Sequence, residues 1–119
     1  MNFYRVGALP AAESSSVEGF FHGRARLEGL ATTGAVGMRV NRVAFGIGAR
    51  TVWHSHAAGQ LLVIVEGEGE VASRDGVNQV GAGDVVWTAP DEEHWHGASE
   101  ASTLVHIAVS LGETRWERA

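Results

Sequence analysis

Two pairs of histidines are the residues of this sequence best suited to chemistry. His54 and His56 lie in TVWHSHAAGQ, which also contains Gln60, and His94 and His96 lie in DEEHWHGA. Residues two apart on a β-strand point to the same face, so each pair can direct both imidazoles toward one point. Imidazole nitrogens and an amide oxygen together suit a divalent ion such as manganese, iron, nickel, copper or zinc.

The predicted metal ligands are His54, His56, Gln60 and His94. Three imidazoles and one neutral oxygen leave coordination positions open for water or substrate, as in a catalytic rather than a structural site. The alternative is that these histidines are ordinary surface or core residues. The repetition of the His-x-His pattern, with glycines at both ends of the first segment, favours the metal site.

The composition excludes several other chemistries. The chain has no cysteine, which removes disulfides, thiolate ligands and thiol nucleophiles. All nine basic residues are arginines, so no lysine amine is present to form a Schiff base. The net charge of -5 is not that of a nucleic-acid-binding protein. We therefore expect a small-molecule substrate and neither a nucleic acid nor a membrane as partner.

Length and patterning predict one small all-β domain. At 119 residues, the chain is predicted to form a single domain over 1–119, with an irregular N-terminal arm over 1–18 and a C-terminal tail over 112–119. No apolar run reaches the roughly 20 residues of a membrane span, and the N-terminus lacks the order of a signal peptide. We expect a cytoplasmic protein.

Short strands separated by glycine-rich turns are predicted along most of the chain. Ala31 to Gly37 is predicted to be a loop, and Gly67-Glu68-Gly69 a turn. Sixteen glycines and the absence of a helical apolar stripe favour a sandwich or barrel. The clearest predicted strands are Met38–Phe45, Thr51–His56, Leu61–Glu66, Glu70–Ser73, Val77–Val80, Val85–Thr88, His94–Gly97 and Thr103–Leu111.

Two spaced motifs resemble those of the cupin family. Gly48-x5-His54-x-His56-x3-Gln60-x6-Gly67 is similar to the first cupin motif, and Gly83-Asp84, Pro90 and His94 are similar to the second. The resemblance implies a jelly-roll barrel, also called a double-stranded β-helix, and the same four metal ligands. Gln60 departs from the glutamate of most cupins, and Asp91-Glu92 replaces the usual Pro-x-Gly.

A narrower resemblance concerns the small cupins that act as manganese-dependent hydroxynitrile lyases. GARTVWHSHAAGQ, GDVVWTAPDEEHWHGA and LVHIAV are similar to those enzymes, which cleave mandelonitrile-type cyanohydrins to an aldehyde and cyanide. They carry glutamine where Gln60 stands and also match at Trp87, Trp95, His96 and His106. The resemblance implies Mn(II) as the cofactor, with Fe(II), Ni(II) or Zn(II) as other choices.

Gln60 has a physical consequence for the bound ion. A carboxylate would cancel part of the metal's charge, whereas a carboxamide leaves it dipositive if the histidines are neutral. Such an ion is a stronger Lewis acid and a better host for cyanide or an alkoxide. It is less suited to stabilising a higher oxidation state, which counts against dioxygenase chemistry.

His96 and His106 are the predicted acid–base residues. His96 shares a strand face with His94, while His106, Ala108 and Ser110 share the predicted inner face of the last long strand. A histidine there can take the hydroxyl proton of a cyanohydrin. The alternative role for His106 is that of a core histidine bonded to a neighbour.

Asn41, Val43 and Ser110 are the predicted substrate contacts. Asn41 and Val43 share a strand face that points across the barrel, and the corresponding strand shapes the pocket of the resembled lyases. Ordinary barrel filling is the alternative role.

The leading functional hypothesis is a hydroxynitrile lyase, in which a histidine acid–base works beside a metal centre of three histidines and one glutamine. One alternative is a metal-dependent dioxygenase or isomerase of small aromatic or enol compounds, which oxygen consumption with phenols would distinguish. Another is a non-enzymatic cupin that binds a small molecule. A homodimer or homotetramer is expected from the resemblance.

Overall fold

The computed structural model describes residues 1–5, 7–13, 19–34 and 37–117, and the regular elements in these ranges are all β-strands. None of the described residues belongs to a helix that is long and apolar enough to cross a membrane. The strands are β1 (Ala11–Glu13), β2 (Phe21–His22), β3 (Ala25–Thr33), β4 (Met38–Phe45), β5 (Arg50–Thr51), β6 (His54–His56), β7 (Gln60–Ser73), β8 (Gly76–Gly81), β9 (Val85–Thr88), β10 (His94–Ala98), β11 (Leu104–Leu111) and β12 (Thr114–Trp116).

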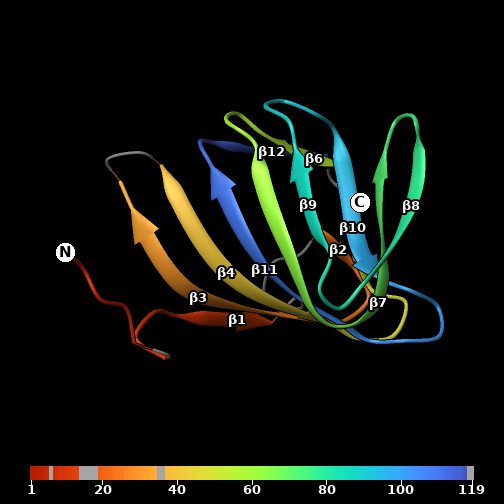
Figure 1. Ribbon diagram of the computed structural model, residues 1–119, viewed down its shortest axis with the longest axis horizontal. Coiled ribbons are helices and arrows are strands. Elements are labelled where there is room, and N and C mark those ends of the chain that lie inside the picture. Colours follow the sequence, from red (N-terminus) through yellow and green to blue (C-terminus); the bar gives the residue numbers. More distant parts are fainter. Residues whose placement is uncertain (6, 14–18, 35–36, 118–119) are drawn as a thin grey trace.

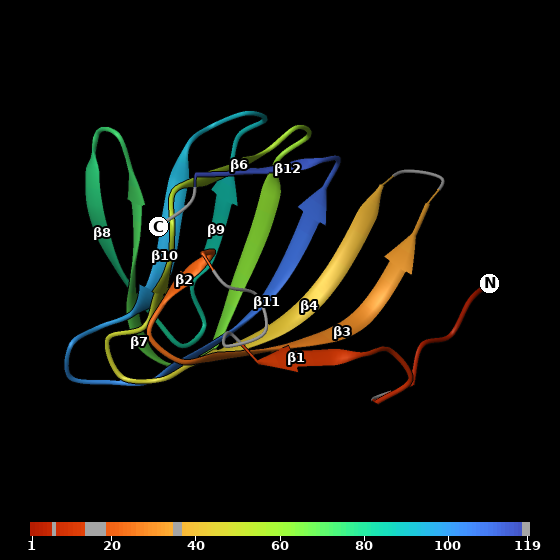
Figure 2. The ribbon, with the colours of Figure 1, turned by 180° about the vertical axis from the view of Figure 1, so that it is seen from behind.

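The strands form two antiparallel sheets that share β7. One sheet has the order β1-β3-β4-β11-β7-β9, and the other has the order β2-β5-β10-β7-β8, with β6 pairing with β10 and β12. Both sheets curl toward each other around a common interior (Figures 1 and 2). The predicted all-β class is confirmed.

The interior changes from apolar to polar along its inward-facing strands. On β11, Leu104 is fully buried at one end, and His106, Ala108 and Ser110 follow on the same face. The main apolar cluster lies at the Leu104 end, and it consists of Ala25, Val43, Phe45, Ala49, Ile64, Ala98 and Leu104. The apolar end therefore holds the sheets together, and the buried polar side chains lie at the other end.

β7 corrects the predicted turn at Gly67-Glu68-Gly69. The strand continues from Gln60 to Ser73, pairing first with β11 and then with β10. Its change of direction comes from a bulge opposite Val105 and His106 and from Gly67, whose φ is 80°. A Cβ at Gly67 would overlap the Thr103 carbonyl, so glycine lets the strand bend without ending.

Three other predictions of irregular structure were wrong in part. Within the predicted arm, residues 11–13 form β1 on the edge of β3; residues 6 and 14–18 lie outside the described part of the chain. The predicted loop begins later than expected, because Ala31–Thr33 extend β3. The predicted tail contains β12, which pairs with β6. Strands of three residues carry too little alternation to be recognised from sequence.

Candidate metal centre

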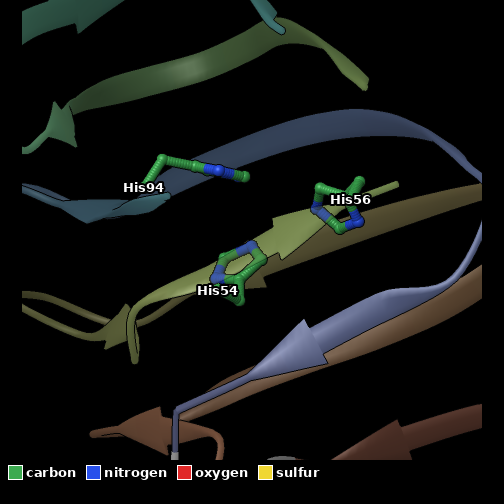
Figure 3. A group of neighbouring side chains, drawn as sticks. All are labelled: His54, His56 and His94. Atoms are coloured by element: carbon green, nitrogen blue, oxygen red, sulfur yellow. The ribbon is translucent and has the colours of Figure 1, made fainter. Parts of the chain in front are cut away.

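Strand register brings the first and second histidine segments together. His54 on β6 lies directly opposite His94 on β10, and their ring centroids are 4.3 Å apart. His56 follows on the same face of β6 (Figure 3). The three imidazoles are buried, and each offers a nitrogen within 4.8 Å of the others. Two paired strands thus bring three ligand atoms close together.

Each of these imidazoles is held through its Nδ1 atom. Nδ1 of His54 lies 2.8 Å from the Val52 carbonyl oxygen, and Nδ1 of His94 lies 3.0 Å from that of Glu92. The break between β5 and β6 places Val52 outside the strands. Nδ1 of His56 lies 2.9 Å from Thr114 Oγ1. An Nδ1–H that donates in this way leaves Nε2 as the lone-pair nitrogen, which is the usual arrangement of metal-binding histidines.

Gln60 directs its amide oxygen into the same cluster. Its Nε2 donates to Ser110 Oγ at 2.9 Å, since the two residues are cross-strand partners, and its Oε1 lies 3.0 Å from His94 Nε2. His94 therefore lies between two oxygen acceptors, the Gln60 amide and the Glu92 carbonyl. A neutral imidazole has one N–H and can satisfy only one of them. If a cation is bound by both His94 Nε2 and Gln60 Oε1, no N–H is needed between these two atoms, and the single N–H can be donated to the Glu92 carbonyl.

Burial keeps the cluster uncharged. It lowers the pKa of His54 well below 6.5, the pKa of His56 to about 4, and the pKa of His94 as well. The neighbouring His94 adds to the lowering for the other two. His56 Nε2 is also buried without a hydrogen-bond partner in the described structure. Three neutral imidazoles, one of them with an unpartnered nitrogen, and an amide oxygen are donors that fit a divalent metal ion.

His96 and His106 form a second, separate pair. His106 Nε2 lies 2.9 Å from His96 Nδ1, so one of these two nitrogens carries the proton between them. Burial lowers the pKa of His96 well below 6.5 and that of His106 to about 4. The outer nitrogens, His96 Nε2 and His106 Nδ1, are buried without a partner in the described structure. This arrangement can accept and pass on a proton.

One partly enclosed cavity of about 100 Å³ joins both groups. His54, His56 and Gln60 contribute to its lining, as do His96 and His106. The predicted substrate contacts Asn41, Val43 and Ser110 also line it, and Val43 is the cross-strand partner of His106. All the residues proposed from the sequence are thus in or beside one space; His94 reaches it through its contacts with Gln60 and His54.

Three residues near the histidines were missed by the sequence analysis. Thr114 and Trp116 on β12 are the cross-strand partners of His56 and His54, and the Trp116 ring stacks on that of His54 at 4.5 Å. Arg39, at the start of β4, also lines the cavity. Arg39 is two residues before Asn41 and four before Val43, so strand alternation could have placed it on the same inward face. The three residues of β12 are too few to show such alternation.

Comparison with known proteins gives consistent results. The family model described as "Cupin domain" matches residues 41–110. A protein of Granulicella tundricola named (R)-mandelonitrile lyase is 46% identical over 69 residues, which are 56% of this chain and 52% of that protein. The chain thus spans about half the length of this curated relative.

Solved structures extend the similarity to the whole chain. A cupin-like protein of Thermotoga maritima has a TM-score of 0.81 and 32% sequence identity. The alignment covers 100% of this chain and 90% of the Thermotoga chain. A polyketide cyclase of Streptomyces resistomycificus has a TM-score of 0.77 at 18% identity, covering 99% and 84%, and shares the fold. With both motifs inside the matched region and the sheets arranged as described, this chain belongs to the cupin family.

Proposed function

We propose that this protein is a metal-dependent hydroxynitrile lyase, which cleaves a small cyanohydrin to an aldehyde and hydrogen cyanide or forms it in reverse. One observation carries the proposal: the His96–His106 pair lies beside the ligand cluster in the same cavity. The His96 ring is 5.1 Å from that of His54 and 5.6 Å from that of His94, measured between centroids. The partial similarity to a mandelonitrile lyase supports the same activity.

The proposed metal ligands are His54, His56, Gln60 and His94, and the preferred ion is Mn(II). A bound divalent ion would supply a dipositive charge that stabilises an anionic oxygen or cyanide. Gln60 contributes an oxygen without a negative charge, and its amide is held by Ser110. The protein's own task here is to present neutral donors in fixed orientations, which the Nδ1 contacts achieve.

The histidine pair would move the proton. His96 Nε2 takes the hydroxyl proton of the cyanohydrin while the proton on Nδ1 shifts toward His106 Nε2. The electrons of the O–H bond form the carbonyl, the C–C bond to the nitrile breaks, and cyanide leaves with the electron pair of that C–C bond. Return of the proton gives hydrogen cyanide and restores the pair. Val43 and Phe45 offer apolar surface to the substrate, and Asn41 an amide.

The direct test is cyanide release from racemic mandelonitrile by protein of measured metal content, with manganese added and with metal removed. We expect metal-dependent release that enriches one enantiomer of the remaining cyanohydrin. His96→Asn should lower the rate by about 10²- to 10⁴-fold while the metal content is unchanged. His22→Asn is the matched control, since His22 is exposed and outside the cavity lining.

A fully loaded protein that releases no cyanide would refute the lyase. Oxygen consumption with phenols would then support dioxygenase chemistry, and tight anion binding without turnover would support a binding protein. Loss of metal in His96→Asn would instead show that the two histidine groups are not functionally separate.

A further inference from the structure

A positive side chain that the proposed reaction does not use also faces the cavity. Arg39 is on β4 with Asn41, Val43 and Phe45 on its inward face, and all four line the cavity. Its cross-strand partner on β11 is Ser110, the residue that holds the Gln60 amide. The guanidinium thus lies on the same row of side chains as a proposed metal ligand.

Two acceptors hold Arg39 in place without neutralising it. Nη2 donates to Thr114 Oγ1 at 3.0 Å, and Nη1 donates to the Gly37 carbonyl at 3.4 Å. Thr114 Oγ1 also contacts Nδ1 of His56. Arg39 and His56, a proposed metal ligand, therefore contact the same hydroxyl group in the wall of the cavity.

The described part of the cavity wall contains no carboxylate to balance this charge. The ion pairs among the described residues, Arg26–Glu13, Arg74–Glu93 and Arg74–Glu117, all lie on the exposed surface. With neutral donors at the metal centre, a bound divalent ion would add to the positive charge of Arg39. A partly buried guanidinium beside a cation favours an anion that can accept its paired N–H groups.

We propose that the substrate of this cavity carries a carboxylate, which Arg39 binds while the reacting oxygen of the substrate lies toward the His54, His56, Gln60 and His94 cluster. This rests on the proposed lyase function and identifies cyanohydrins of aldehyde or keto acids as the preferred substrates of that reaction.

Binding of glycolate and glycolamide to manganese-loaded and metal-stripped protein, measured by calorimetry, tests this independently of turnover. The two probes have nearly the same size and hydroxyl group, and only glycolate is charged. Arg39→Gln should weaken glycolate binding by about tenfold and leave glycolamide binding unchanged. Arg39→Lys should restore part of the loss, because it keeps the charge without the planar fork. Arg42→Gln, a change on the opposite face of β4, should behave as wild type.

Several outcomes would overturn the carboxylate site. They are an absence of glycolate binding, full glycolate affinity in Arg39→Gln, or an equal loss for both probes, which would mean a purely structural role. Cyanide release separates this from the lyase proposal. If Arg39→Gln slows cyanide release from the cyanohydrin of glyoxylate but not from mandelonitrile, both proposals stand. If no cyanohydrin reacts but glycolate binding depends on Arg39, only the lyase fails.

Discussion

The two histidine groups in the cavity differ in what holds their rings. His54, His56 and His94 each have Nδ1 against an oxygen of the protein, so a defined nitrogen faces the common point. His96 and His106 instead contact each other at 2.9 Å, and neither outer nitrogen has a partner in the described structure. Both groups are buried to a similar degree. Burial alone therefore does not distinguish a metal ligand from a residue that moves protons.

The difference lies in control of the tautomer. An oxygen acceptor at Nδ1 fixes the proton there and keeps Nε2 available as a ligand. Two imidazoles that share a hydrogen bond can exchange the position of their proton with little movement of either ring. The first arrangement suits a fixed coordination site, and the second suits acid–base work.

The largest expected effect comes from removing a ligand in the anchored group. His94→Ala should lose more than about 100-fold in metal affinity, since replacing even supporting residues costs 10- to 100-fold. His106→Ala should keep its metal, because His106 belongs to the mutually bonded pair. Metal content per chain after dialysis, measured by mass spectrometry, gives the comparison. Equal metal loss in both variants would remove the distinction between the groups.

A second effect should appear in the pH dependence of stability of the metal-stripped protein. The pKa of His106 falls from 6.5 to about 4 on folding, so the unfolded chain binds more protons between these pH values. Stability contributed by neutral His106 is complete above pH 6.5 and is lost as the pH falls through about 4. At about 1.4 kcal/mol per pH unit, this interval corresponds to about 3 kcal/mol.

Urea unfolding at several pH values would measure this contribution. His106→Gln cannot titrate and should lose less stability than wild type between neutral pH and about pH 4. His22→Gln, at an exposed position, should follow the wild-type curve. Parallel curves for wild type and His106→Gln would contradict the buried neutral state of this residue.

The smallest expected effect concerns the anchor on β12. Thr114→Val removes the oxygen beside His56 Nδ1 but keeps the shape of the side chain. Metal affinity should fall by about tenfold, at the lower end of the range for supporting residues, because the ligand itself remains. Thr114→Ser should retain the affinity. Metal titration of the three proteins distinguishes an anchoring hydroxyl from simple packing, which would make serine as harmful as valine.

The histidine positions could be predicted because alternation in a strand is a strict geometric rule. His54 with His56, His94 with His96, and His106 with Ser110 each follow this period, and the structure places all of them on inward faces. Met38–Phe45 and Val85–Thr88 also have the predicted bounds, since glycines or polar turns flank both strands. These features depend on local sequence alone.

The features that were not predicted depend on long-range register. Gly67 and Gly69 have the composition of a turn, but their partners on β11 and β10 keep the chain extended. Thr114 and Trp116 belong to a segment of three residues, and their importance arises only from pairing with β6. Arg39 has the parity of an inward residue, yet its role depends on which charges face it across the sheet.

The chemical nature of the three anchors also affects how this site can evolve. Two of them are main-chain carbonyls, of Val52 and Glu92, and any amino acid at those positions supplies the same oxygen. The anchor of His56 is a side chain, that of Thr114, whereas the side chain at His54 Nδ1, Thr51 Oγ1, is farther away, at 3.4 Å. A substitution at Thr114 can therefore change how His56 is held. Substitutions at Val52 and Glu92 leave the carbonyl contacts of His54 and His94 in place.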